Sequence, residues 1–271
     1  ITNFFDDRRI KGTKIKFWGE IYNNPTILVR QIYDTDNNSE LGSFDEFLEQ
    51  FNIIRENMKT KLDSIFSLDT RQSGLLVYPD GSYGEKGFKK YIKSVRKKYY
   101  GVSKYYIDFK FNTDIPDSLK NINLEDLKSL SIKYYSVLKS ILENPNECHF
   151  VYCDLINGSG IRVFSLLLQS ILKFKKITKS KRNLDPDRRY MLLTGENYQE
   201  DINKLIKRFN NENNFDGKYI QVILGTDKVK QGVSFFHIKH IHVLTPHWNY
   251  SKIEQVIARG IRLDSHKFLL N

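Results

Sequence analysis

The sequence is poor in cysteine and has no long apolar run. Its two cysteines, Cys148 and Cys153, cannot build a disulfide framework, which indicates a reducing compartment. No stretch approaches the roughly 18 consecutive apolar residues of a membrane span, since even the dense run from Val163 to Leu168 is interrupted by a polar residue. The first residues also lack the apolar core of a signal peptide. We therefore expect an intracellular protein without membrane attachment.

Aromatic residues and positive charge are abundant instead. The 271 residues include 16 tyrosines and 18 phenylalanines, which exclude a low-complexity disordered chain. Lysine and arginine number 43 against 32 aspartates and glutamates, a net charge of +11. Such a surface suits a polyanion such as nucleic acid, although it also serves simple solubility. The length fits one large or two ordinary domains. Because the chain does not begin with Met, we expect a piece of a longer protein.

No metal site is predicted from the cysteine and histidine pattern. Cys148, His149 and Cys153 fall in an apolar, strand-like run and do not make the four-ligand spacing of a structural zinc site. Five histidines gather late in the chain with no cysteine near them: His237, His240, His242, His247 and His266. We expect these side chains to be satisfied polar positions rather than ligands.

The hydrophobic pattern divides the chain into two regions. Residues 1–120 mix helix and strand patterns and form a smaller α+β accessory or connecting region, which ends in a polar linker around Pro116. In residues 121–271 short apolar strands alternate with helices, which is typical of an α/β fold with a parallel sheet flanked by helices. The predicted strands are 14–22, 26–33, 105–111, 149–153, 190–193, 219–224 and 240–245, and the predicted helices are 44–65, 88–99, 124–141, 161–172, 198–209 and 251–262.

Two lysine-rich segments concentrate the positive charge. The first segment is the predicted helix 88–99 with the two residues before it. It carries apolar residues on one side and lysines on the other, among them Lys86, Lys90 and Lys93. This basic face is either a solvated surface or a contact to a phosphate backbone. The second segment, 173–182, has six basic residues in ten and no apolar period, so it is predicted to be a loop.

The stretch 222–266 carries the residues with the clearest chemistry. An apolar strand ends in Thr226 and Asp227, and ligands of open α/β sheets bind at such carboxyl ends. Farther on, Gln255, Arg259 and Arg262 follow at spacings of four and three, which place them on one face of a helix. Two arginines on one face either make ion pairs or hold an anion, and the fork of the guanidinium suits phosphate.

Together these segments resemble the C-terminal, second RecA-like lobe of superfamily 2 helicases. Thr226-Asp227-x4-Gly232-x-Ser234 is similar to motif V, and Gln255-x3-Arg259-x2-Arg262 is similar to motif VI. The segments Phe150–Cys153 and Gly158–Gly160 resemble motif IV. Further likeness at 232–236, 241–244 and 246–249 is to helicases of large cytoplasmic DNA viruses, the group of the poxvirus early transcription factor small subunit and nucleoside triphosphatase I.

The resemblance implies a role for each matching residue. Arg259 and Arg262 would stabilise charge at the γ-phosphate of ATP, and Gln255 would position them or the attacking water. Gly232 and Ser234 would lie near the nucleotide. The residues that would face nucleic acid are Thr194, Gly195, Thr226 and Asp227, joined by the lysines Lys86, Lys90 and Lys93.

One departure from the helicase pattern matters most. The sequence contains neither a Gly-x4-Gly-Lys-Ser/Thr loop nor an Asp-Glu box, so ATP and Mg²⁺ would be held mainly by a first lobe outside this chain. We expect the fragment alone to be inactive as an ATPase. The implied partners are DNA or RNA, the first lobe and viral transcription machinery, in a virion or the host cytoplasm. The alternative is a non-enzymatic module of a viral transcription factor that binds nucleic acid or polymerase.

Overall fold

A computed structural model describes eight segments of the chain: residues 14–16, 68–98, 105–116, 118–177, 185–194, 199–227, 233–245 and 250–261. The chain divides into two compact units. Unit 1 comprises residues 1–32, 140–154 and 174–271, and unit 2 comprises residues 33–139 and 155–173. Within the described segments, no helix combines the length and the apolar character needed to cross a membrane.

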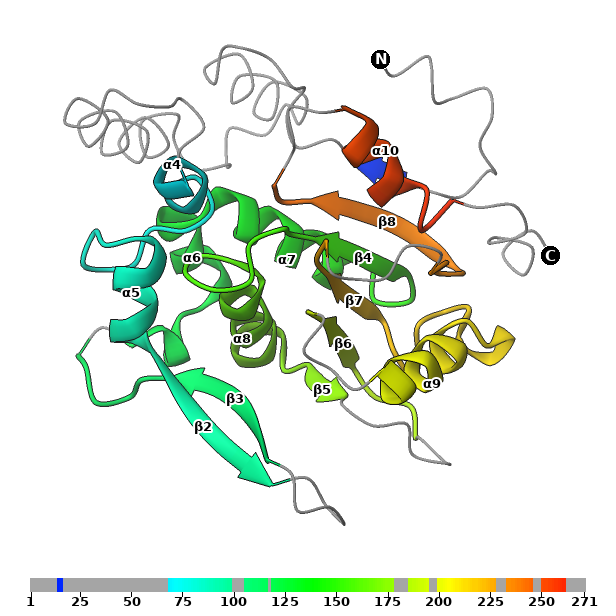
Figure 1. Ribbon diagram of the computed structural model, residues 1–271, viewed down its shortest axis with the longest axis horizontal. Helices are drawn as coiled ribbons and strands as arrows, with labels where there is room; N and C mark the ends of the chain where they lie inside the picture. Colours follow the sequence, from blue (N-terminus) through cyan, green and yellow to red (C-terminus); the bar gives the residue numbers. More distant parts are fainter. Residues whose placement is uncertain are drawn as a thin grey trace. The chain divides into compact units, whose positions relative to one another are not determined.

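Unit 1 contains a six-stranded sheet in which every neighbouring pair is parallel. The order is β1-β8-β4-β7-β6-β5 (Figure 1). The strands are β1 (Lys14–Lys16), β4 (Cys148–Tyr152), β5 (Lys175–Ile177), β6 (Arg189–Leu193), β7 (Val222–Gly225) and β8 (Ile238–Val243). β4 and β7 are buried along their whole length, because strands in the middle of a parallel sheet are covered on both faces.

Helices α9 (Gln199–Phe209) and α10 (Tyr250–Ile257) pack on one face of this sheet (Figure 1). Their apolar residues, including Leu205, Phe209 and Val256, join a buried cluster with the alternate strand residues Phe150, Ile223 and others. A short 3₁₀ turn, η2 (Glu212–Asn214), follows α9. This is the RecA-like parallel sheet flanked by helices that the sequence predicts, and the predicted fold class is confirmed.

Unit 2 combines helices with an antiparallel hairpin. The hairpin pairs β2 (Ile92–Lys98) with β3 (Tyr105–Phe111). The helices are α4 (Leu68–Ser73), α5 (Gly84–Tyr91), η1 (Leu119–Asn121), α6 (Leu124–Leu130), α7 (Ile132–Glu143) and α8 (Ile161–Leu172), of which α7 continues into unit 1. The predicted mixed α+β region therefore has both kinds of element. The buried helix predicted at 161–172 has these bounds in the structure.

Three predicted elements differ from the structure in their type or number, and a fourth, the helix 251–262, is shorter than predicted. The predicted helix 88–99 ends at Tyr91, because Ile92 adopts an extended conformation and begins a strand that pairs with β3. The predicted helix 124–141 is two helices, because Ser131 is extended (φ −162°) and its hydroxyl accepts from the Tyr134 amide. The predicted loop 173–182 begins with strand β5, and residues 178–182 lie outside the described residues.

Other predictions fall wholly or partly beyond the described segments. The strand expected at 26–33 and the helix expected at 44–65 lie outside the described residues, and the strand expected at 14–22 is described only as β1. The division at residue 121 stays a prediction. The compact units follow packing instead, since residues 68–116 lie in the same unit as α8.

Candidate functional site

The carboxyl ends of four neighbouring strands lie side by side in unit 1. Tyr152 at the end of β4 is in register with Gly225 of β7 and Val243 of β8, and Gly225 is in register with Leu193 of β6. The residues that follow these strands therefore meet at one edge of the sheet. This carboxyl edge is where open parallel sheets bind ligands, and it gathers Asp154, Thr194, Thr226, Asp227 and Thr245.

The two predicted nucleic-acid threonines at this edge are buried. Thr194 is 4% exposed and Thr226 is 1% exposed. Both the amide and the hydroxyl of Thr226 donate to the carbonyl oxygen of Leu193, each at 3.3 Å. The Thr226 hydroxyl thus ties β7 to β6. The contact predicted between Thr226 and nucleic acid stays a prediction, and the exposed Asp227 is the more accessible of the adjacent pair.

Asp227 is held by a residue that the sequence analysis did not select. The Tyr152 hydroxyl donates to Asp227 Oδ1. Burial of the phenol, followed by the bond and the charge of Asp227, raises the pKa of Tyr152 above its ordinary range. The phenol is therefore a neutral donor that fixes the second residue after β7. The signal in the sequence was weak, since Tyr152 reads as one more apolar strand residue.

A second pair of contacts fixes the ends of β4 and β8. The Asp154 amide donates to the Thr245 hydroxyl at 2.9 Å, and the Leu244 amide donates to the Tyr152 carbonyl at 2.9 Å. These bonds run between segments separated by about ninety residues of sequence. Hydrogen bonds therefore connect the ends of β4, β6, β7 and β8 along the carboxyl edge.

Asn210 organises the segment that resembles the end of motif V. Its side-chain amide donates to the Ser234 carbonyl at 2.9 Å, and its oxygen accepts from the Phe236 amide at 2.9 Å. Both bonds of one side chain thus grip the backbone on the two sides of Phe235. Asn210, just after α9, thus positions the half-buried Ser234, which is predicted to lie near nucleotide. Several asparagines stand close together here, so the sequence alone does not single out Asn210.

The segment that resembles motif VI is joined to the same place. The Phe235 amide donates to the Arg259 carbonyl at 2.7 Å. The predicted helix 251–262 is shorter than expected, because α10 ends at Ile257 and a tighter turn follows, with the Arg259 amide donating to Val256 at 3.3 Å. Arg259 therefore lies just beyond the helix and is half-buried, whereas Gln255 is exposed on α10.

The structure places the predicted residues Arg259 and Ser234 on two segments that are hydrogen-bonded through Phe235. The contact of both residues with a nucleotide stays a prediction. Arg262, Gly232 and Gly195 lie outside the described residues.

The loop 158–160, which resembles part of motif IV, lies in unit 2, and its polar groups are hydrogen-bonded to other residues of the protein. The Gln72 side-chain oxygen accepts from the Ser159 amide at 2.9 Å, and the Ser159 hydroxyl donates to the Leu76 carbonyl at 2.8 Å. The Tyr78 hydroxyl donates to the Gly158 carbonyl at 2.8 Å. Gly158 has φ +64°, which a residue with a side chain rarely adopts. The loop before α8 is thus held by hydrogen bonds to residues 72–84.

The predicted basic face of unit 2 is partly neutralised. Lys90 pairs with Asp80 at 2.7 Å, and Lys93 pairs with Asp114. Lys86 is exposed on α5, whereas Lys93 lies on β2 because the predicted helix ends before it. The three lysines therefore do not share a helix face, and their contact to a phosphate backbone stays a prediction.

Comparison with known proteins identifies relatives for most of this chain. The family model described as the helicase conserved C-terminal domain matches residues 133–264. "Putative helicase 087L" of Invertebrate iridescent virus 3 is 35% identical over 209 residues, which cover 76% of this chain and 20% of that protein. "Putative helicase 009L" of Frog virus 3 is 36% identical over 151 residues, with 56% and 15% covered. "Putative ATP-dependent RNA helicase R563" of Acanthamoeba polyphaga mimivirus is 29% identical over 217 residues, with 79% and 32% covered. The chain thus spans a third or less of the length of these relatives.

Proposed function

Residues 133–264 are a helicase conserved C-terminal domain, and on this premise we propose that the chain is the second RecA-like lobe of an ATP-dependent superfamily 2 helicase or translocase of a large DNA virus. Under this proposal it acts on DNA or RNA, in a virion or the host cytoplasm, and serves viral transcription. Viral helicases among the relatives support this proposal, and one relative carries ATP dependence in its printed name.

The observation that carries the proposal is the bond between the Phe235 amide and the Arg259 carbonyl. It brings the end of motif V and the arginine of motif VI to one place, although the two are distant in sequence. Under the proposal Ser234 and Arg259 would both face the nucleotide, and this bond would hold their backbones next to each other. Asn210 adds rigidity, since it holds the backbone on both sides of Phe235.

In this mechanism the arginines of the chain supply positive charge. Arg259, with Arg262 beside it in sequence, would neutralise charge that develops on the transferred phosphoryl group. Mg²⁺ bound with ATP on the first lobe would supply the remaining charge neutralisation. Gln255, exposed one helical turn before Arg259, would orient Arg259 or the attacking water. The carbonyl anchor of Arg259 fixes where its side chain starts, so that little ordering is needed on closure.

The carboxyl edge of the sheet would carry the nucleic-acid contacts. Phosphate contacts position a protein on a strand without reading its sequence, which suits a translocase. Thr194 and Thr226 are buried, and the Thr226 amide already donates to Leu193, so the neighbouring residues Gly195 and Asp227 are the ones that would meet a strand. Lys86, Lys90 and Lys93 would add charge on unit 2, with Lys90 and Lys93 exchanging their aspartate partners for phosphate.

ATP turnover tests the enzymatic part of the proposal. The chain alone is expected to hydrolyse no ATP above background, and a preparation that also contains the P-loop lobe is expected to hydrolyse ATP when nucleic acid is added. Arg259→Ala should lower that turnover by at least ~10³-fold, the scale of an arginine finger. Lys218→Ala, which removes an exposed charge before the amino end of β7 and outside the motifs, is the control. Turnover by the chain alone, abolished by Arg259→Ala, would contradict the two-lobe arrangement.

Binding at two salt concentrations tests the nucleic-acid part. Single-stranded DNA and RNA should bind the chain less tightly at higher salt, because bound lysines release counterions from the strand. Replacing Lys86 and Lys90 with glutamine should reduce the salt slope by about 0.7 for each lost phosphate contact on a single strand. Binding with no salt dependence would count against a phosphate track. Normal binding with no ATPase in the complete enzyme would favour the alternative of a non-enzymatic transcription-factor module.

A further inference from the structure

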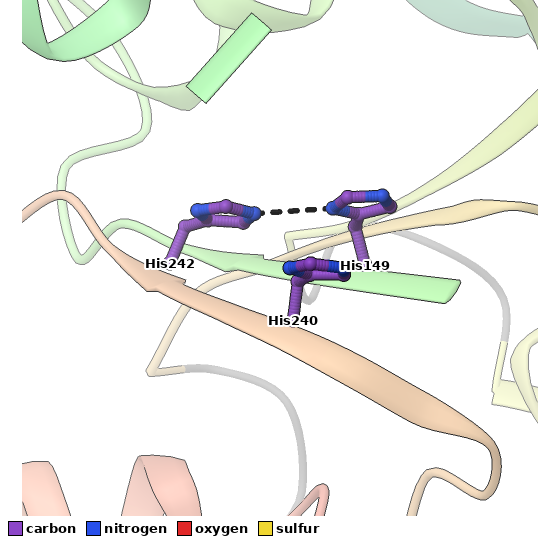
Figure 2. Close-up of side chains that lie close together, drawn as sticks. All are labelled: His149, His240 and His242. Atoms are coloured by element: carbon purple, nitrogen blue, oxygen red, sulfur yellow. Dashed lines mark hydrogen bonds between the residues drawn. The ribbon is translucent and has the colours of Figure 1, made fainter. Parts of the chain in front are cut away.

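Three buried histidines lie together on one face of the sheet in unit 1. His149 comes from β4, and His240 and His242 come from the adjacent strand β8 (Figure 2). The register pairs His149 with His240 directly and places His242 opposite Val151, so all three side chains leave the sheet on the same side. Their exposed fractions are 0%, 2% and 1%.

The three imidazoles are close enough to share one ligand. One ring nitrogen from each lies within 4.8 Å of the others. His149 Nδ1 and His242 Nε2 are 3.1 Å apart and face each other across the dashed line in Figure 2. The His240 ring stacks on that of His149, with centroids 4.4 Å apart and 11° between planes. Two zinc-bound nitrogens at 2.0–2.1 Å from the ion stand about 3.3 Å apart in a tetrahedral site, which is close to the His149–His242 separation.

Oxygen acceptors hold the outer nitrogens of two rings. His240 Nε2 contacts the carboxylate of Glu147, which also pairs with Lys239 at 3.4 Å. His149 Nε2 lies 3.4 Å from the Asn144 carbonyl oxygen. An acceptor at Nε2 places the ring proton there, which leaves Nδ1 as the basic nitrogen. This is the arrangement seen around metal-binding histidines, where a carboxylate or carbonyl orients the ring.

Burial also keeps His149 neutral. Desolvation, followed by the nearby His240, lowers the pKa of His149 to about 3. A neutral imidazole is the form that binds a metal. His149 Nδ1 and His242 Nε2 lie 3.1 Å apart, which leaves one of them to donate to the other, and an ion could take the place of that proton.

We propose that His149, His240 and His242, with Glu147 and the Asn144 carbonyl as outer partners, form a binding site for a first-row divalent metal ion of the zinc class. Imidazole ligands suit zinc, copper, nickel and cobalt, whereas magnesium and calcium prefer oxygen. Among the described residues, the group of three or more histidine, cysteine, aspartate or glutamate side chains that lies close enough to hold an ion is this set of three histidines.

The metal would join two neighbouring strands through the second residue of β4 and the third and fifth residues of β8. His149 is the second residue of β4, whereas the carboxyl edge begins after Tyr152. The site is therefore separate from the residues assigned to ATP and nucleic acid, and the inference does not rest on the proposed function. The sequence did not predict it, because the register that brings His149 to His240 joins residues about ninety apart.

Metal binding by the 271-residue chain tests the site directly. Chain stripped with a chelator and titrated with Zn²⁺ is expected to bind one ion at this cluster and to melt at a higher temperature, because the ion binds the folded state. Co²⁺ should give the visible absorption of a low-coordinate nitrogen site. His242→Gln should weaken binding by at least ~100-fold, and Glu147→Ala, which keeps all three imidazoles, should weaken it about 10–100-fold.

The matched control is His237→Asn. It removes a buried histidine on the segment before β8, and asparagine tolerates its φ of +63°. This variant should bind Zn²⁺ as the wild type does. Circular dichroism in chelator checks that each variant folds, and Glu147→Ala decides the case if His242→Gln does not. Absence of bound Zn²⁺ in the folded wild type, or equal affinity in wild type and in the folded cluster variants, would overturn the proposal.

Discussion

The amide of Phe235 donates to the carbonyl oxygen of Arg259 across 2.7 Å. This bond makes the backbone before β8 and the turn after α10 a single unit. A displacement of either segment must therefore move the other or break the bond. The predictions that follow concern the residues that maintain this unit and the other fixed points of the fold.

Asn210→Ala should destabilise the chain by about 1–2 kcal/mol. The variant loses both bonds to the backbone around Phe235, and the partners are half-buried. Native-state hydrogen exchange should show faster exchange at the Phe236 amide. The exposed Asn213, with alanine in its place, should change stability by less than about 0.5 kcal/mol. An unchanged Phe236 exchange rate in Asn210→Ala would contradict the bridging role.

Asn214→Ala should cost more, about 3 kcal/mol. The Asn214 side chain is 1% exposed and makes four bonds to backbone groups of Phe209, Tyr219 and Ile220. Removing it leaves those buried groups without this partner. Urea unfolding measures the free energy. Asn211→Ala, which removes one exposed capping bond, should cost at most about 1 kcal/mol. Equal costs for the two variants would contradict this assignment.

Gly158→Ala should destabilise unit 2 more than Gly81→Ala does. Both glycines have positive φ, +64° and +75°, so both variants incur the left-handed penalty of about 1 kcal/mol. A Cβ at Gly158 would also lie 1.7 Å from Gln72 Oε1, whereas a Cβ at Gly81 meets nothing within 4 Å. The additional cost should be about 1–3 kcal/mol, because Gln72 must leave the Ser159 amide.

A double-mutant cycle isolates the Gln72 contribution. In a Gln72→Ala background the clash is absent, so the extra cost of Gly158→Ala over Gly81→Ala should disappear. If the difference persists at its full size, the strain arises elsewhere in the loop.

The Asp80–Lys90 pair should make stability depend on acid pH. Burial alone would raise the pKa of Asp80, but bonds from Lys90 and Ser82 outweigh it and lower the pKa from 3.8 to about 2. A carboxyl with a lowered pKa stabilises the fold above its unfolded value, and this contribution is lost as the pH falls from about 4 to about 2. Wild type should exceed Asp80→Asn by less than about 1 kcal/mol at pH 6, because the pair is partly exposed.

Asparagine at position 80 can still accept the Ser82 bonds, so the comparison isolates the charge. Denaturant unfolding of both proteins from pH 6 to pH 2 should show the two curves converging below pH 4. A constant difference over this range would show that the Asp80 carboxylate is not the cause.

Much of the fold is predictable from local pattern. The βα alternation after residue 121 gives the parallel sheet, and α8 is found at its predicted bounds because its apolar residues extend around the whole helix. Helix 88–99 was wrong for a long-range reason. Ile92 and Val95 fit a helix face as well as a strand, and pairing with β3 decides in favour of the strand.

The candidate site is predictable only in part. The resemblance to superfamily 2 helicases is confirmed for residues 133–264, because its motifs are local strings of residues. Asn210 and Tyr152 escaped prediction, because their roles depend on acceptors that only the folded chain brings near. The ion pairs of Lys90 and Lys93 also escaped prediction, because their partners Asp80 and Asp114 come from other loops, and the contact of these lysines with phosphate stays a prediction.

The bond between Gln72 and the Ser159 amide spans 87 residues of sequence. Residues 72–84 are synthesised before residues 155–173, so the acceptors on Gln72 and Leu76 are made before the loop residue Ser159 that donates to them. The contacts between this loop and residues 72–84 are expected to form late in folding, since long-range contacts form only after the entropy of loop closure has been overcome. A shorter protein cut at the family boundary, residue 133, would keep the loop but lose Gln72 and Tyr78, leaving buried polar groups to seek other partners. A division of the chain at the family boundary would thus remove hydrogen-bond partners of the loop before α8.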